Sequence, residues 1–147
     1  MVSDPTGTLL QREPMDGYAG LWNALQAIAS DKLVLPGTTL FHQGTAARGL
    51  FLVYSGEIRL SVSEQSTGFR VAGSGSVLGL PALFSGEPYS LTAVAISEAE
   101  VGFISREAAR ELFQSHVELC LAAAGVLAGE LRELRQRQAR SILLVHL

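Results

Sequence analysis

The sequence is poor in the residues that build cross-links and metal centres. It contains one cysteine, Cys120, and three histidines that lie far apart, at positions 42, 116 and 146. A single cysteine excludes an internal disulfide, a four-cysteine iron–sulfur cluster and a zinc site made of thiolates. The histidines form neither an H-E-x-x-H pattern nor a close pair, so the sequence indicates no metal site.

An excess of positive charge is also absent. The chain has 11 lysines and arginines against 14 aspartates and glutamates, a net charge of -3. It therefore has no overall attraction to nucleic acid or to an anionic membrane. No stretch of eighteen residues is apolar and free of charge, and the N-terminus lacks the basic-then-apolar order of a signal peptide. We expect no membrane association and place the protein in the cytoplasm.

Patterns of catalytic residues are missing as well. The sequence has no Gly-x-Ser-x-Gly motif, and Cys120 falls on an apolar helical stripe that is typical of an inert buried thiol. Glu98 and Glu100 share one face of a predicted strand, which favours an exposed pair. We therefore predict no catalytic residue and no enzyme activity. A cupin-like metalloenzyme is the alternative, and copurification of one equivalent of metal would support it.

The residues that are present indicate one folded domain with terminal helices. The chain has 147 residues, 48% of them hydrophobic, and 15 glycines, which fits a compact fold rich in turns. Evenly spaced short strands separated by glycine-containing turns favour a sandwich or a closed barrel. These strands are predicted at 32–35, 39–42, 50–54, 57–62, 69–72, 90–95 and 101–104.

Helices are predicted on both sides of the strand region. Asp16 can cap a helix in which Leu21, Leu25 and Ile28 recur at helical spacing. Ser105 can cap a second helix over 106–113, and a longer helix begins near residue 117. We divide the chain into a mobile N-terminal arm (1–15), a β-barrel domain (16–115) and a C-terminal dimerisation helix (116–147).

The rest of the chain is organised around residues 78–95. Gly79 permits a tight turn, Pro81 suits the start of a short helix, Gly86 permits a second turn, and 90–95 alternates as a strand does. The free N–H groups at such a helix start suit an anion, although the same pattern fits a simple packed connection.

This stretch resembles the phosphate-binding cassette of cyclic-nucleotide-binding domains. Gly79, the pair Ala82-Leu83, and then Pro88, Thr92 and Ala95 follow the cassette's spacing without a gap. Glycines at 37, 44, 49 and 56 match the family's hairpins, and the resemblance covers about 32–140. It implies the Crp/Fnr superfamily of transcription regulators. The implied fold is mainly β, a double-stranded β-helix (jelly-roll) barrel with flanking helices and a long C-terminal dimerisation helix.

The departures from the cassette fall on its two charged positions. The family's glutamate, which holds the ribose, is Leu80 here, and its arginine, which neutralises the cyclic phosphate, is Tyr89. Loss of the arginine is expected to cost about 2–5 kcal/mol and loss of the ribose hydrogen bond about 1–3 kcal/mol, roughly three to five decades of affinity. The ligand pocket implied by the resemblance comprises Gly79, Leu80, Ala82, Leu83, Tyr89, Ser90 and Thr92.

Apolar residues of the C-terminal helix recur at alternating steps of three and four, the pattern of two packed helices. They predict a homodimer through this helix. The predicted dimer seam comprises Leu127, Leu131, Leu134 and Gln138, preceded by Cys120 and Ala124.

We therefore expect a non-enzymatic, effector-sensing regulatory domain that passes the state of its pocket to the dimer helix. No cofactor is predicted, and the effector is an unknown small molecule. In this superfamily a helix-turn-helix domain follows the dimer helix, and no such domain lies within the 147 residues. DNA binding would need a missing domain or a partner. The alternatives are a true cyclic AMP or cyclic GMP module, using Tyr89, Ser90 and backbone donors, and a ligand-free dimerisation domain.

Overall fold

The computed structural model describes residues 9–62 and 68–146, without the side chains of 9–16, 134 and 137–146. Residues 1–8 of the predicted mobile arm (1–15) lie outside the described residues, and residues 9–15 belong to the first helix. The elements follow in the order α1 (Leu9–Ala27), β1 (Ser30–Val34), β2 (Thr39–Phe41), β3 (Gly49–Ser55), β4 (Ile58–Ser61), β5 (Phe69–Ala72), β6 (Val77–Leu78), α2 (Leu80–Ser85), β7 (Thr92–Ala95), β8 (Ala99–Ser105), α3 (Arg106–Ser115) and α4 (Val117–His146).

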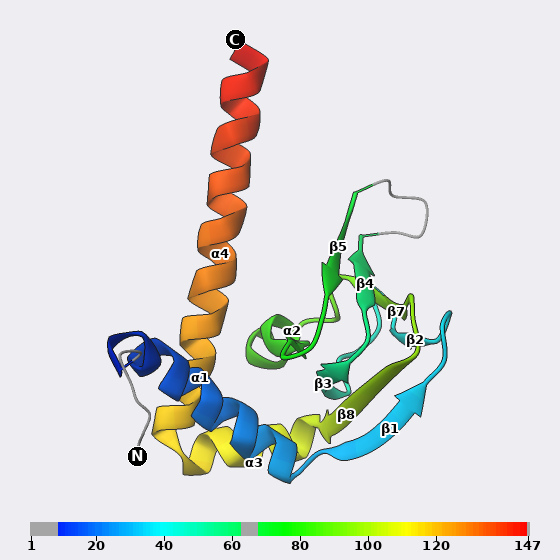
Figure 1. Cartoon of the computed structure of the whole chain (residues 1–147), viewed down its shortest axis with the longest axis vertical. Helices are drawn as coiled ribbons and strands as arrows, with labels where there is room; N and C mark the ends of the chain where they lie inside the picture. Colours follow the sequence, from blue (N-terminus) through cyan, green and yellow to red (C-terminus); the bar gives the residue numbers. More distant parts are fainter. Residues whose placement is uncertain (1–8, 63–67, 147) are drawn as a thin grey trace.

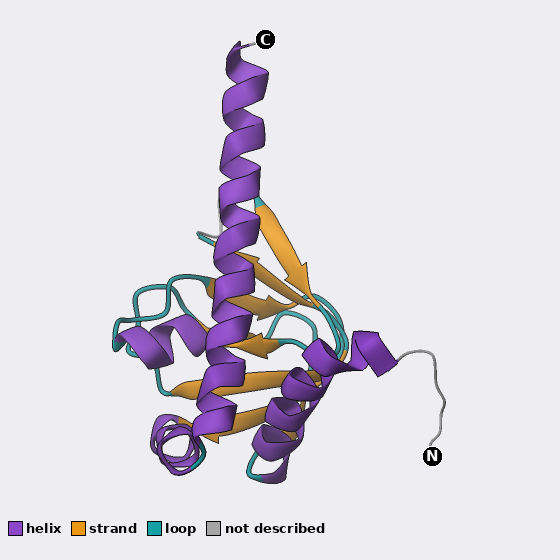
Figure 2. Ribbon diagram, turned by 90° about the vertical axis from the view of Figure 1, so that its left-hand side faces the viewer, coloured by secondary structure: helices purple, strands orange, loops and turns teal. Residues whose placement is uncertain are grey.

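The strands form two antiparallel sheets of four, ordered β1-β8-β3-β6 and β2-β7-β4-β5. This β-rich arrangement, with helices at one end, agrees with the predicted jelly-roll fold (Figure 1). The described strands make two separate ladders and not one closed ladder, so the predicted closed barrel is not shown. The helix α4 runs past the sheets and extends beyond them (Figure 2).

Strand β3 is buried on both faces because it lies between two cores. Successive side chains of a strand point to opposite faces. Val53 therefore belongs to the core between the sheets, together with Ile58 and Val101. Leu50 and Leu52 belong to a second core, in which the helices pack on the outer face of the sheet. The second core fixes α1, α3 and the first half of α4 against the sandwich.

The first helix begins earlier than predicted. Helix α1 starts at Leu9, so Asp16 lies inside it and the prediction of an N-cap at Asp16 is wrong. Leu, Gln, Arg and Glu at 9–13 are strong helix formers, which explains the earlier start. Ile28 follows the last helical residue and is exposed. The two-residue strand β6 was not predicted, since two residues carry no periodic signal.

The third helix begins as predicted. The Ala108 N–H donates to the Ser105 side-chain oxygen at 3.1 Å, which makes Ser105 the N-cap of α3. Helix α4 begins at Val117, also as predicted. Within the described residues, no helix by itself has the length and apolar composition needed to cross a membrane, although α3 and the start of α4, bent by 115°, meet that test as a pair.

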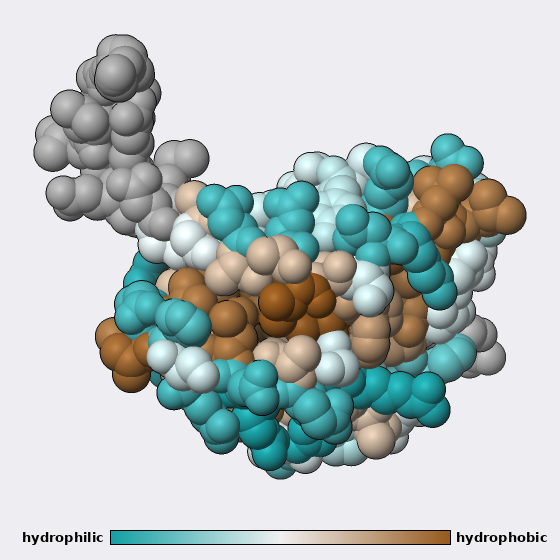
Figure 3. Space-filling model, turned by 90° about the horizontal axis from the view of Figure 1, so that it is seen from below, coloured by the Kyte–Doolittle hydropathy of each residue, from teal (hydrophilic) through white to brown (hydrophobic). Residues whose placement is uncertain are grey.

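The lower side of the molecule, where α1, α3 and β1 lie in Figure 1, is mostly hydrophilic. A band of apolar residues crosses the middle of this face (Figure 3). Exposed apolar side chains of the described residues include Ile28 after α1 and Leu33 on β1.

Candidate functional site

The turn and short helix predicted at 78–86 are confirmed. Gly79 is the N-cap of α2 with φ = 101°, and Gly86 is its C-cap with φ = 76° and donates to the carbonyl of Ala82. A Cβ at position 79 would lie 3.0 Å from the carbonyl oxygen of Gly49. Only glycine therefore fits this turn without strain. The turn brings α2 against the start of β3.

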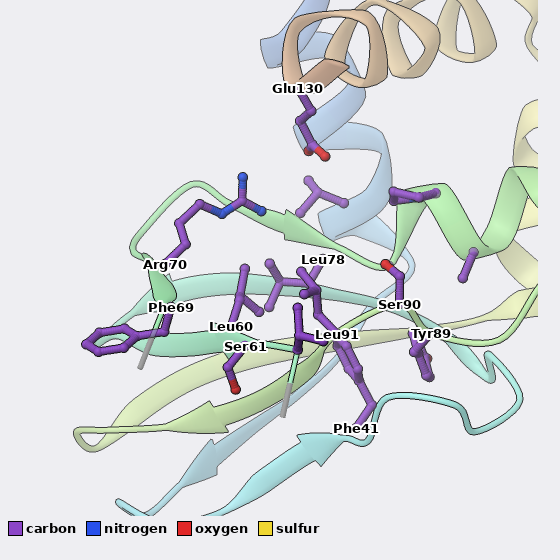
Figure 4. A pocket seen from close by; sticks show the side chains of 16 residues that line it. Phe41, Leu60, Ser61, Phe69, Arg70, Leu78, Tyr89, Ser90, Leu91 and Glu130 are labelled. Atoms are coloured by element: carbon purple, nitrogen blue, oxygen red, sulfur yellow. The ribbon is translucent and has the colours of Figure 1, made fainter. Parts of the chain in front are cut away.

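A cavity of about 640 Å³ opens between α2, strands β4 to β6 and helix α4. We call it the first cavity (Figure 4). It contains four of the seven pocket residues predicted from the sequence: Gly79, Ala82, Tyr89 and Ser90. Most of the other lining residues are apolar, and they include Phe41, Leu60, Val62, Phe69, Val77, Leu78, Pro81 and Leu91.

The other three predicted pocket residues do not line the first cavity. Leu80 is 0% exposed and belongs with Leu83 to the second core, under the helices. Thr92 is buried in β7, and its hydroxyl oxygen accepts the N–H of Gln43 at 2.9 Å. The side chain at position 80, which the resemblance aligns with the family's glutamate, is therefore packed in the second core.

Tyr89 is the residue that the resemblance places at the family's arginine, and its polar atom is used by the protein itself. Its hydroxyl donates to the carbonyl of Gly49 at 2.7 Å and accepts the N–H groups of Arg48 and Gly49 at 3.2 Å each. Its ring stacks on Phe41 with centroids 4.0 Å apart and planes 18° apart. Only 4% of the residue is exposed. Tyr89 contributes a ring to the cavity wall, and its hydroxyl is engaged with backbone.

Two charged residues that sequence reasoning missed stand at the other side of the first cavity. Arg70 comes from β5 and Glu130 from α4. In Figure 4 the Glu130 carboxylate points from the helix toward the cavity, and Arg70 rises toward it from the strand. Sixty residues separate them in the chain, so no local spacing could have indicated that they meet.

The electrostatics of Glu130 reflect its position between helix and sandwich. Burial raises the pKa of Glu130 above its ordinary value, the positive charge of Arg70 lowers it, and the negative charge of Glu133 raises it further. Burial also raises the pKa of Tyr18 on α1, with a smaller contribution from Glu130. The Tyr18 hydroxyl donates to the carbonyl of Gly75 in the turn before β6. The carboxylate thus lies where α1, α4 and the strands converge.

Helix α4 presents two different faces. Leu127 and Cys120, both in the seam predicted from the sequence, pack against the second core of the same chain. Leu131 is 50% exposed, and the side chains of Leu134 and Gln138 lie outside the described residues. The exposed small and apolar residues form a stripe at steps of four and three, which we call the outer stripe: Val117, Leu121, Ala124, Ala128 and Leu131.

The described residues hold no group of three or more His, Cys, Asp or Glu side chains that could bind a metal ion. His42 is exposed at the end of β2, and His116 is the C-cap of α3. Cys120 is a free thiol, partly buried in the second core.

Residues 32–116 match the family model of the cyclic nucleotide-binding domain. No curated protein matches the sequence significantly. The crystal structure of the catabolite activator protein of Thermus thermophilus is similar, with a TM-score of 0.70 and 25% identity over 82% of this chain and 58% of that one.

Two further solved structures share the fold. The c-di-GMP-responsive global regulator CLP of Xanthomonas campestris has a TM-score of 0.67 and 22% identity over 83% of this chain and 63% of that one. The sensor domain of the transcriptional regulator DNR of Pseudomonas aeruginosa has a TM-score of 0.64 and 20% identity, covering 88% and 90%. The chain therefore spans less than two thirds of the catabolite activator protein and of CLP.

Proposed function

Because the chain belongs to the family of cyclic nucleotide-binding domains, we propose that it is an effector-sensing regulatory domain of Crp/Fnr type. One observation carries the proposal: Glu130 of α4 lines the same cavity as α2 and strands β4 to β6. An effector in this cavity would contact the sandwich and the helix together. Its binding free energy can then favour one position of α4 over another, which is the requirement for a ligand-driven switch.

The effector that fits is not a cyclic nucleotide held by the usual phosphate contacts. Near α2 the cavity wall is built by Tyr89, Ser90 and Ala82, which carry no positive charge. The Tyr89 hydroxyl is already engaged with the backbone of residues 48 and 49. A buried phosphate without a paired cation is strongly disfavoured. A mainly apolar effector that hydrogen-bonds Glu130 or Arg70 fits the lining better.

The partner that we propose is a second copy of the chain, joined through α4. The outer stripe leaves Val117 and Leu121 70% and 68% exposed, and apolar residues repeated at steps of three and four are typical of paired helices. The proposed units are the sandwich with its flanking helices, 16–115, and the dimerisation helix, 116–147. A regulatory role in transcription would further require a DNA-binding domain or a partner that supplies one.

Thermal melts with cyclic AMP and cyclic GMP, at about 1 mM each, test the proposal. A ligand at about 100 times its dissociation constant stabilises the folded state by about 2.7 kcal/mol. We expect no shift of the melting temperature with either nucleotide, and a dimer in sedimentation at micromolar concentrations. A shift of several degrees would support true nucleotide binding. A monomer at high micromolar concentration would overturn the dimeric switch.

A further inference from the structure

A second cavity, of about 600 Å³, lies on the other side of the Phe41–Tyr89 pair. Both residues line both cavities, so the stacked rings separate them. The second cavity opens between strands β1, β3 and β8 and the loop that joins β2 to β3. Its volume is within the range of small-molecule sites in proteins.

The interior of the second cavity is aromatic. Phe51 of β3 and Phe103 of β8 are cross-strand partners whose ring centroids lie 5.1 Å apart, and Phe41 lies 5.8 Å from Phe51. Phe51 and Phe103 are only partly buried, although large apolar side chains between two sheets are usually covered. Offset or tilted aromatic contacts of this kind favour a planar ring as a further neighbour.

The mouth of the second cavity carries an excess of positive charge. Lys32 and Arg48 line it and are exposed, and His42 lies beside them. The one carboxylate in the lining, Asp31, accepts a hydrogen bond from the Tyr54 hydroxyl at 2.8 Å. Burial and this hydrogen bond raise the pKa of Tyr54 to about 12, so the hydroxyl remains protonated and continues to donate.

The position of Arg48 is fixed by its backbone. Its N–H donates to the Tyr89 hydroxyl at 3.2 Å, and its carbonyl accepts the N–H of Arg106 at 2.8 Å. The loop that carries Arg48 is further tied by Gly44, whose N–H donates to the Tyr89 carbonyl at 2.9 Å. A loop held at these points keeps the backbone of Arg48 at the mouth of the cavity, and such preorganisation favours ligand binding.

We propose that the second cavity binds a small planar aromatic anion, with its ring beside Phe51 and Phe103 and its acidic group at Lys32 and Arg48. The carboxylate, sulfonate or phosphate of such a compound would meet the same two cations. This site is separate from the effector cavity proposed above, and its occupant does not depend on Glu130 or Arg70.

Calorimetric titration with 2-naphthoate, compared with the neutral isostere 2-naphthamide, tests the proposal. We expect 2-naphthoate to bind measurably at about 1 mM and to lose affinity as salt is added, with 2-naphthamide about tenfold weaker. The double variant Lys32→Gln/Arg48→Gln should weaken 2-naphthoate about tenfold. Both side chains are exposed, so this variant should fold normally. Arg70→Gln, at the first cavity, is the matched control and should leave binding unchanged.

Amide chemical shifts during the same titration locate the ligand. We expect the largest changes at residues 42–49 and 101–103, and small ones at residues 60, 70 and 130. Absence of binding, equal affinity for the acid and the amide, or loss of binding in Arg70→Gln would overturn the second site. Loss of binding in Arg70→Gln would place the ligand in the first cavity. The other two results would leave the proposed sensing role, which depends on the first cavity and α4, unaffected.

Discussion

The two sides of the first cavity differ in how their polar groups are used. On the α2 side, the hydroxyl of Tyr89 is engaged with backbone at residues 48 and 49, and Leu80 faces away into the helical core. On the α4 side, Glu130 and Arg70 bring opposite charges to the cavity. In cyclic-nucleotide-binding domains the charged chemistry is expected beside α2. Here the charged side chains lie on the α4 side of the cavity, and α4 is the helix that we propose responds to the effector.

Restoring the family's glutamate should have the largest effect, and it tests whether position 80 faces the cavity. Leu80→Glu would place a carboxylate in the second core, where Leu80 is fully buried. We expect a loss of about 3–5 kcal/mol in the free energy of unfolding, measured by urea denaturation. Leu80→Met, which conserves volume, should cost less than about 1.5 kcal/mol. A stable Leu80→Glu variant that gains cyclic AMP binding would contradict this placement.

The next largest effect should show which face of α4 forms the dimer contact. Leu121→Asp puts a charge on the outer stripe, and we expect the dimer dissociation constant in sedimentation to rise by about 30-fold or more, with little change in monomer stability. Leu127→Asp is the matched control, because Leu127 packs on the second core of its own chain. It should lower the melting temperature instead. Dissociation by Leu127→Asp alone would favour the seam predicted from the sequence.

Removal of the Tyr89 hydroxyl should lower the free energy of unfolding by less than Leu80→Glu does. It tests the side of the first cavity that carries no charge. Tyr89→Phe leaves the N–H groups of Arg48 and Gly49 without this acceptor, so we expect a loss of about 1–3 kcal/mol in chemical denaturation. Ser90→Ala, at the exposed neighbouring residue, should stay within about 0.5 kcal/mol of the parent. An unchanged stability of Tyr89→Phe would mean that the hydroxyl is available to a ligand.

The smallest effect concerns the charged side of the cavity. The folded-state pKa of Glu130 is raised, so its contribution to stability is present below the ordinary pKa and is lost as pH rises through the raised value. Glu130→Gln should therefore raise the melting temperature at pH 7, by on the order of a degree or two because solvent screens a half-exposed carboxylate, with the difference disappearing near pH 4. Glu111→Gln, at an exposed carboxylate of α3, is the control. A lower melting temperature for Glu130→Gln at pH 7 would indicate that pairing with Arg70 outweighs desolvation.

Patterns local in the chain were predictable. The strands other than β6, the turn at Gly79, the N-cap at Ser105 and the start of α4 at Val117 follow from residues within a few positions of one another. The seam on α4 shows the limit of such patterns. Steps of three and four indicate an apolar stripe on a helix, but two series of residues fit these steps equally well. One is the predicted seam, which begins at Cys120, and the other is the outer stripe, which begins at Val117. Packing of Cys120 and Leu127 on the second core leaves the outer stripe exposed.

The sequence by itself determined the family and the β-rich architecture, because hydrophobic alternation and glycine turns are local. Through the resemblance it also indicated that Leu80 and Tyr89 stand at the cassette's charged positions, because residue identity is local too. Only the tertiary structure decided where the polar groups act. It turned Leu80 into the helical core, engaged the Tyr89 hydroxyl with the backbone of residues 48 and 49, and brought Arg70 together with Glu130. These outcomes depend on contacts between segments distant in sequence, and such contacts are set by how the elements pack.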